Sequence, residues 1–142
     1  MAAITRLDVR VITGNRPSAG TDGDIFVAVA GREFCLDSAV DDFERGADRT
    51  YILGVGAGAG STINNPAYND PRSPFALDTV DLDRFPMWIR FEPAGGSPNW
   101  DLEEVTVTVN PGPSQVQYRA LGGGNHLWLG QDFGKYCFLK RV

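Results

Sequence analysis

The sequence is poor in the residues that build metal clusters and nucleophilic sites. It holds two cysteines and one histidine in 142 residues, which excludes a cysteine–histidine zinc site and a disulfide framework. Runs of lysine or arginine are also missing, and 13 basic against 18 acidic residues leave a formal charge of −5. Because phosphate neutralisation needs clustered cations, nucleic acid is not an expected partner.

Long apolar stretches are equally absent. No segment approaches the roughly 20 apolar residues of a membrane span, and the N-terminus runs into an alternating pattern without the apolar region of a signal peptide. We therefore expect a cytoplasmic location by default, with peripheral attachment to a membrane as the alternative. The strand-like neighbours of Cys35 and Cys137 predict buried thiols, although one bridge between the two stays open.

What the chain does contain is typical of an all-β protein. Its 17 glycines and 9 prolines interrupt the sequence too often for long helices, and its length suits one domain over residues 1–142. Apolar residues recur at every second position in short segments, as expected for strands. These segments are residues 7–11, 25–30, 34–36, 50–53, 87–92, 105–109, 115–119, 126–129 and 136–140. Around Trp88, either both faces of the strand are covered or this tryptophan is partly exposed.

Two stretches depart from this alternation. Residues 54–78 show neither strand nor helix periodicity and predict a long surface loop, which in compact domains is often functional. Within it, the pattern Gly54, Gly56 and Ala59 lacks the following helix that a dinucleotide site needs, so we expect a flexible or closely packed loop. The only expected helix is a turn or two over Val40–Arg45.

Enzymatic chemistry has little support in the sequence. His126 is the single histidine, and no glycine–serine–glycine elbow or reactive-cysteine context accompanies it. A histidine beside Leu127 and Trp128, at the start of a predicted strand, indicates a structural role. We therefore expect no catalytic residues.

The densest acidic group is Asp37, Asp41 and Asp42, in a loop between two predicted strands. A solvated acidic turn is one interpretation. Calcium binding is the other, because Ca²⁺ takes about six to eight oxygen ligands that mix carboxylates with backbone carbonyls, and irregular loops supply both. Gly20 permits a tight turn whose carbonyl would join such a site.

Several motifs together resemble the PLAT domain, also called the lipoxygenase homology domain, which is a lipid- and partner-binding β-sandwich. The motifs cover most of the chain. They are Thr13–Gly14 with the following Ala19–Asp22, the stretch Asp42–Tyr51 that is similar to the family's Phe-x-x-Gly-x-x-Asp-x-Tyr signature, Met87–Arg90, Trp100–Val105 and Trp128–Leu129. The similarity is closest to the C-terminal membrane-binding domain of clostridial phospholipase C toxins. The resemblance implies an antiparallel eight-stranded β-sandwich.

In those toxin domains calcium lies among three loops, and the resemblance implies a ligand set in this chain. The implied ligands are the side chains of Asp37 and Asp42, the carbonyls of Gly20, Thr21 and Val40, and the amide oxygen of Asn99. Ser18 and Pro98 stand where the family pattern has carboxylates, so the resemblance implies weak calcium binding. The alternative is that the fold persists without its ion site.

The resemblance also assigns the aromatic residues. Trp100 and Trp128 are expected in the core, whereas Tyr68, Phe75 and Trp88 are candidates for membrane or partner contact. The leading hypothesis is a non-catalytic binding module that docks through its loops, with or without calcium, to a lipid or membrane surface or to a protein partner. The alternative is a protein-interaction or structural subunit that uses the loop at 54–78, with no role for calcium or lipid.

Overall fold

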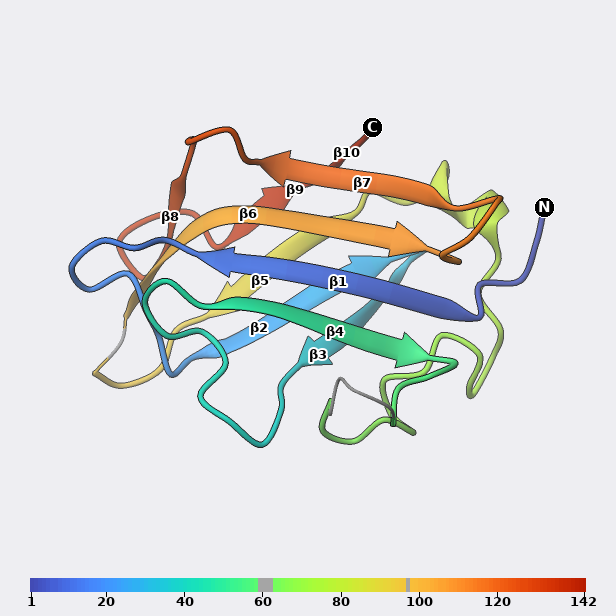
Figure 1. The fold of residues 1–142 in the computed structure, drawn as a ribbon, viewed down its shortest axis with the longest axis horizontal. Helices are drawn as coiled ribbons and strands as arrows, with labels where there is room; N and C mark the ends of the chain where they lie inside the picture. Colours follow the sequence, from blue (N-terminus) through green and yellow to red (C-terminus); the bar gives the residue numbers. More distant parts are fainter. Residues whose placement is uncertain (59–62, 97) are drawn as a thin grey trace.

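The computed structural model describes residues 1–58, 63–96 and 98–142, which form two antiparallel sheets packed face to face (Figure 1). The first sheet has the strand order β10-β7-β6-β1-β4, with β8 beside β6. Its strands are β1 (Arg6–Thr13), β4 (Asp48–Gly54), β6 (Asn99–Val109), β7 (Val116–Leu121), β8 (Leu127–Gly130) and β10 (Lys140–Arg141). The second sheet has the order β3-β2-β5-β9. Its strands are β2 (Asp24–Val29), β3 (Arg32–Leu36), β5 (Trp88–Glu92) and β9 (Tyr136–Phe138).

The predicted all-β antiparallel sandwich is confirmed, with ten strands in the described part of the chain instead of eight. The alternation predicted nine strand segments, and the tenth strand arises at the C-terminus, where the predicted strand 136–140 divides at Leu139 into β9 and β10 in different sheets. One helical segment is present among the described residues, the 3-10 helix η1 (Thr79–Leu82). Within the same ranges no helix has the length and apolarity that crossing a membrane requires.

The core lies between the sheets and follows the alternation of the strands. On β1, and on β6 from Val105 onward, every second residue is buried, among them Val9 and Val107, which face each other across the ladder. Trp100 at the start of β6 is completely buried, as expected, and its indole Nε1 donates a hydrogen bond of 3.0 Å to Thr13 Oγ1. Trp128 is only half-buried, which corrects its expected core position, because the alternation of β8 buries Leu129 instead.

The segment 37–47 contains no helix, so the predicted helical turn over Val40–Arg45 is wrong. Asp42 explains the difference, because its carboxylate accepts hydrogen bonds from both the backbone N and the Oγ of Ser38, at 2.8 and 2.5 Å. Such side chain–backbone bonds compete with helix formation. The segment therefore forms an irregular loop between β3 and β4.

The described residues between 55 and 78 form no strand or helix, as predicted for this loop, but part of it is anchored along the free edge of β3. The backbone N of Cys35 donates to Asn69 Oδ1 at 2.8 Å, and the Arg32 guanidinium donates to the carbonyls of Tyr68 and Asp70. Ala59 of the glycine pattern lies outside the described residues. Gly54 has a φ of 88° and lies so close to the Thr5 carbonyl that a side chain would clash there, which fits a tight turn.

Both cysteines are free and half-buried. They lie on β3 and β9, the two outer strands of the second sheet, so three strand spacings of about 4.8 Å separate them. This distance exceeds the roughly 7 Å between Cα atoms that a disulfide spans. Burial raises the pKa of both thiols, which lowers the share of reactive thiolate near neutral pH.

Candidate functional site: an acidic cleft between two loops

Two loops at one end of the sandwich enclose a cleft of about 370 Å³, which we call the acidic cleft. The first loop (residues 14–23) joins β1 to β2, and the second loop (residues 37–47) joins β3 to β4 (Figure 1, left). The cleft is lined by Thr21, Asp22, Gly23, Asp24, Leu36, Asp37, Val40, Asp41, Asp42 and Phe43. Among the described residues, none of these carboxylates forms an ion pair.

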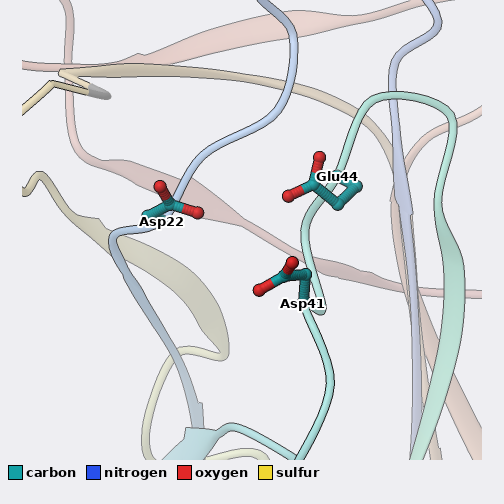
Figure 2. Close-up of side chains that lie close together, drawn as sticks. All are labelled: Asp22, Asp41 and Glu44. Carbon is teal, nitrogen blue, oxygen red and sulfur yellow. The ribbon is translucent and has the colours of Figure 1, made fainter.

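Three exposed carboxylates converge between the loops, as Figure 2 shows. One oxygen each of Asp22, Asp41 and Glu44 lies within 4.8 Å of the others. Asp22 comes from the first loop, and the other two come from the second. Like charges at this separation repel one another, and carboxylate oxygens are the ligands that hard divalent cations prefer. The donor set therefore suits calcium better than zinc or copper.

The two aspartates expected as ligands already accept hydrogen bonds from neighbouring residues. Asp42 is only 6% exposed and holds Ser38 through both of its oxygens. Asp37 lines the cleft, but its Oδ2 accepts a hydrogen bond of 2.9 Å from Asn64 Nδ2. Asp22 and Glu44 thus join the carboxylates available to a cation.

The remaining expected ligands divide between two places. Thr21 and Val40 line the acidic cleft. Gly20 and Asn99 instead line a neighbouring cleft, where Asn99 Nδ2 donates to Asp132 Oδ2 at 3.0 Å. The structure therefore brings four of the six expected residues to one cleft.

The neighbouring cleft, which we call the aromatic cleft, has a volume of about 430 Å³. It is lined by Ser18, Gly20, Gly96, Pro98, Asn99, Trp128 and Phe133. The rings of Trp128 and Phe133 are stacked with centroids 6.4 Å apart, and Phe133 is 50% exposed. Because Gly20 lines one cleft and Thr21 the other, an acidic and an aromatic surface lie on either side of the same loop segment.

The three aromatic residues expected to contact a membrane or partner lie away from both clefts. The carbonyl of Tyr68 binds Arg32, at the opposite end of β3 from Asp37. Phe75 lies in the same stretch, and both rings are largely exposed, at 80% and 61%. Trp88 is half-buried on the outer face of the second sheet and donates from Nε1 to Glu33 Oε2 at 2.9 Å. Partial exposure was one of the two alternatives that the sequence left for this tryptophan.

The second loop is fixed to the core through Phe43. Its ring contacts Trp100 edge-on with a centroid distance of 5.6 Å, and contacts Tyr51 at 6.0 Å. Burial, followed by the nearby Asp42 carboxylate, raises the pKa of Tyr51. This phenol therefore stays neutral, and Phe43 ties the loop that carries Asp41 and Glu44 to the core.

The first loop is fixed by a buried aspartate that the sequence did not indicate. Asp101 on β6 is completely buried; its backbone N donates to the Ala19 carbonyl and its carbonyl accepts from Gly14 N. Its side-chain Oδ1 lies 2.8 Å from His126 Nδ1, and its Oδ2 lies 3.5 Å from Arg16 Nε. A side chain at Gly14 would clash with Asp101 Oδ2, so glycine there allows the loop to approach β6.

Strand alternation alone would place Asp101 opposite the core-facing Trp100, on what looks like a solvent-exposed face. The cover over that face comes from the first loop, far away in sequence. His126, predicted to be structural, has Asp101 as its partner. In the described part of the chain no nucleophilic side chain bonds to this histidine.

Comparison with known structures agrees with this architecture. Alpha-toxin from Clostridium absonum aligns with 98% of this chain at a TM-score of 0.62 and 23% identity. Coral 8R-lipoxygenase aligns with 96% at a TM-score of 0.60 and 19% identity, and alpha-toxin from an avian strain of Clostridium perfringens with 99%, at 0.52 and 20%. No protein-family model and no curated protein matches the chain by sequence.

These structures define the fold class of the chain. It is a two-sheet antiparallel β-sandwich of the kind present in alpha-toxins and lipoxygenases, and the PLAT-like fold that the sequence motifs predicted is thereby confirmed. The chain spans only 32% and 31% of the two toxins and 17% of the lipoxygenase. At these levels of identity the likeness establishes the fold.

Proposed function

We propose that this chain is a non-catalytic module that docks to a lipid surface through the loop end of the sandwich, assisted by weakly bound calcium. The observation that carries the proposal is the juxtaposition of the two clefts on either side of Gly20 and Thr21. Membrane-binding domains combine charged contacts at the headgroup level with apolar side chains that insert below it. The toxin domain that the sequence motifs resemble also binds membranes.

Calcium has support of its own. Asp22, Asp41 and Glu44 would hold the ion, and Thr21 and Val40, whose carbonyls are the expected further ligands, line the same cleft. When bound, calcium supplies positive charge that offsets the acidic cleft and bridges to anionic headgroups. Coral 8R-lipoxygenase, a structural neighbour, is described with calcium activation via a C2-like domain. With ligands from two loops, we expect a dissociation constant of about 0.1–1 mM, as in extracellular calcium modules.

Calcium is expected to raise the melting temperature of this protein. At a tenfold excess over the dissociation constant, the stabilisation is about 1.4 kcal/mol, which corresponds to a shift of roughly 3–5 °C. Asp41→Asn should abolish most of the shift, because it removes one of three convergent carboxylates. Asp83→Asn is the matched control, since Asp83 is exposed and makes only a 3.5 Å ion pair with Arg141. Equal shifts for both variants would contradict the site, and differential scanning fluorimetry measures them.

Liposome co-sedimentation tests the docking surface. Vesicles that contain phosphatidylserine should pellet the protein in calcium and release it in chelator. Phe133→Ala should weaken the binding roughly tenfold, because a half-exposed ring at the aromatic cleft loses about 1.4 kcal/mol of buried apolar contact. Tyr68→Ala and Phe75→Ala serve as controls at the opposite end of the sandwich. Loss of binding in these controls, with Phe133→Ala unaffected, would move the docking surface to the loop at 63–78.

The protein-interaction alternative predicts no sedimentation in either condition. The calcium experiment stays informative in that case, because it reports on the acidic cleft without any lipid. A calcium shift without vesicle binding would retain the ion site and reject the lipid surface.

A further inference from the structure

The two edge strands of the four-stranded sheet, β3 and β9, differ in whether another segment covers them. The β3 edge is covered by part of the loop that follows β4. There, Asn69 and the carbonyls of Tyr68 and Asp70 accept hydrogen bonds from β3 residues. The β9 edge has no corresponding cover among the described residues. Natural sheets usually protect their edges with charge, proline, bulges or covering loops. β9 itself, with the sequence Tyr136–Phe138, has neither charge nor proline.

The backbone of β9 is oriented for pairing with another strand. Leu139 N donates to the Met87 carbonyl, and Phe91 N donates to the Lys135 carbonyl, so the odd-numbered residues of this segment bond to β5. In an antiparallel ladder the intervening residues direct their N–H and C=O groups away from the partner. Tyr136 and Phe138 therefore present the hydrogen-bonding groups of an open edge.

Beside this edge lies a groove with an apolar floor and cationic sides, of about 360 Å³, which we call the β9 groove. It is lined by Arg119, Ala120, Leu121, Cys137, Phe138, Lys140, Arg141 and Val142, with no acidic residue. Both lysines of the chain, Lys135 and Lys140, flank β9. In the described part of the protein neither lysine forms an ion pair, nor does Arg119. A chain with a formal charge of −5 thus concentrates unpaired cations at its open edge.

We propose that β9 is a docking site for an acidic, extended peptide segment of a partner protein, which adds to the second sheet as a further strand. Main-chain hydrogen bonds to Tyr136 and Phe138 supply the pairing, as in other cases of strand addition. The cations along the groove select acidic side chains. This surface is distinct from the loop end and does not depend on calcium or lipid.

The alternation of a strand also specifies the sequence pattern of the peptide. Side chains on one face reach the cationic groove, whereas those on the other face lie beside an aromatic cluster on the outer surface of the sheet. That cluster consists of Trp88, Tyr136 and Phe138, with ring centroids 5.8 to 6.4 Å apart. Tyr136 and Phe138 are each about half-exposed, at 49% and 56%. The preferred peptide therefore alternates acidic and apolar residues.

A second copy of this chain is the less favourable occupant. Antiparallel pairing of two β9 strands would bring Lys135 and Lys140 of both copies along one seam. Like charges directly across a pair of strands destabilise it. An acidic partner removes this repulsion.

Fluorescence anisotropy with a short labelled peptide of alternating glutamate and valine tests the proposal. We expect binding that weakens as salt is added, and no binding of the matched peptide with lysine in place of glutamate. Lys140→Glu should weaken binding roughly tenfold, which corresponds to about 1.4 kcal/mol. Arg84→Glu is the charge-matched control, because Arg84 lies outside the groove.

A pair of variants at one position separates strand pairing from simple charge attraction. Tyr136→Ala removes the ring but keeps the outward N–H, whereas Tyr136→Pro also removes this donor without breaking a bond to β5. Binding that persists in the alanine variant and is lost in the proline variant supports strand addition, provided that the circular dichroism spectra agree. Equal binding by the two variants, or no binding by the unmodified protein, would overturn the proposal. Dimerisation of the unmodified protein in analytical ultracentrifugation, abolished by Tyr136→Pro, would replace the peptide with a second copy.

Discussion

Replacing Trp100 with alanine is expected to lower the free energy of unfolding by about 3–5 kcal/mol, the range for large aromatic residues removed from cores. The side chain is completely buried, contacts Phe43 and Phe91 with centroid distances of 5.6 and 5.8 Å, and binds Thr13 through its indole nitrogen. It therefore joins both sheets to the second loop. In a domain whose total stability is about 5–15 kcal/mol, this loss is a large fraction.

Urea denaturation measures the effect, and two companion variants assign its cause. Trp100→Phe keeps part of the ring contacts and loses the bond to Thr13, so its cost should be clearly smaller. Thr13→Ala isolates the hydrogen bond, expected to contribute about 0.5–1.5 kcal/mol. An alanine variant at Trp100 that loses less than about 1 kcal/mol would mean that the core closes around the cavity, against the contact geometry.

The same substitution should reduce calcium binding, although Trp100 is not a ligand. Phe43 packs on Trp100 and lies between the carboxylate-bearing residues Asp41 and Glu44. When the ring is removed, the second loop loses a packing partner, and a site that needs convergence of two loops is weakened. The calcium-induced shift in melting temperature is therefore expected to be smaller in Trp100→Ala than in the unmodified protein.

Sequence patterns predicted the strands well because burial on one face of a sheet imposes a period of two, as on β1 and on β6 from Val105 onward. They failed where contacts between distant segments decide the outcome. Trp128 is a large aromatic residue of the kind expected in a core. However, β8 pairs with the first part of β6, and the Trp128 ring lines the aromatic cleft. The residue types of Val40–Arg45 are compatible with a helix, but the hydrogen bonds that Asp42 accepts from Ser38 favour an irregular loop instead.

The sequence predicted the location of the candidate site more accurately than the residues that form it. The sequence pointed to the two loops, and four of the six expected residues line the acidic cleft. It could not indicate that Asp22 and Glu44 would converge with Asp41, because this depends on how the loops approach each other in space. The burial of Asp101 escaped prediction for the same reason, since its cover is the first loop.

Removing the imidazole of His126 is expected to destabilise the protein by about 2 kcal/mol, although the side chain is partly exposed. His126 Nδ1 lies 2.8 Å from Asp101 Oδ1, within hydrogen-bond distance. The aspartate is completely buried, and its Oδ2 has no hydrogen-bond partner among the described residues apart from the 3.5 Å ion pair with Arg16. His126→Ala therefore leaves a buried carboxylate almost unsatisfied, which costs far more than losing a surface contact.

A double-mutant cycle with Asp101→Asn separates this cause from general packing. In the Asp101→Asn background the buried group is neutral, so His126→Ala should cost clearly less than in the unmodified protein. His126→Asn should restore much of the stability, because its amide nitrogen occupies a position similar to Nδ1. Gln131→Ala, at an exposed position in the loop after β8, is the control and should change stability by less than about 0.5 kcal/mol. If His126→Ala costs the same with aspartate or asparagine at position 101, the carboxylate is not the cause.

The Asp101–His126 pair also affects the acidic cleft, through the backbone hydrogen bonds that Asp101 makes to the first loop. Asp101 binds Gly14 and Ala19 on either side of the turn that leads to Thr21 and Asp22. A buried charge without its partner draws water or moves toward solvent, and either response displaces the first loop. We therefore expect His126→Ala to weaken calcium binding as well as stability, and His126→Asn to recover both. Calcium titration of the three proteins, followed by the melting temperature, measures this coupling; unchanged calcium affinity in His126→Ala would show that the first loop keeps its position without the pair.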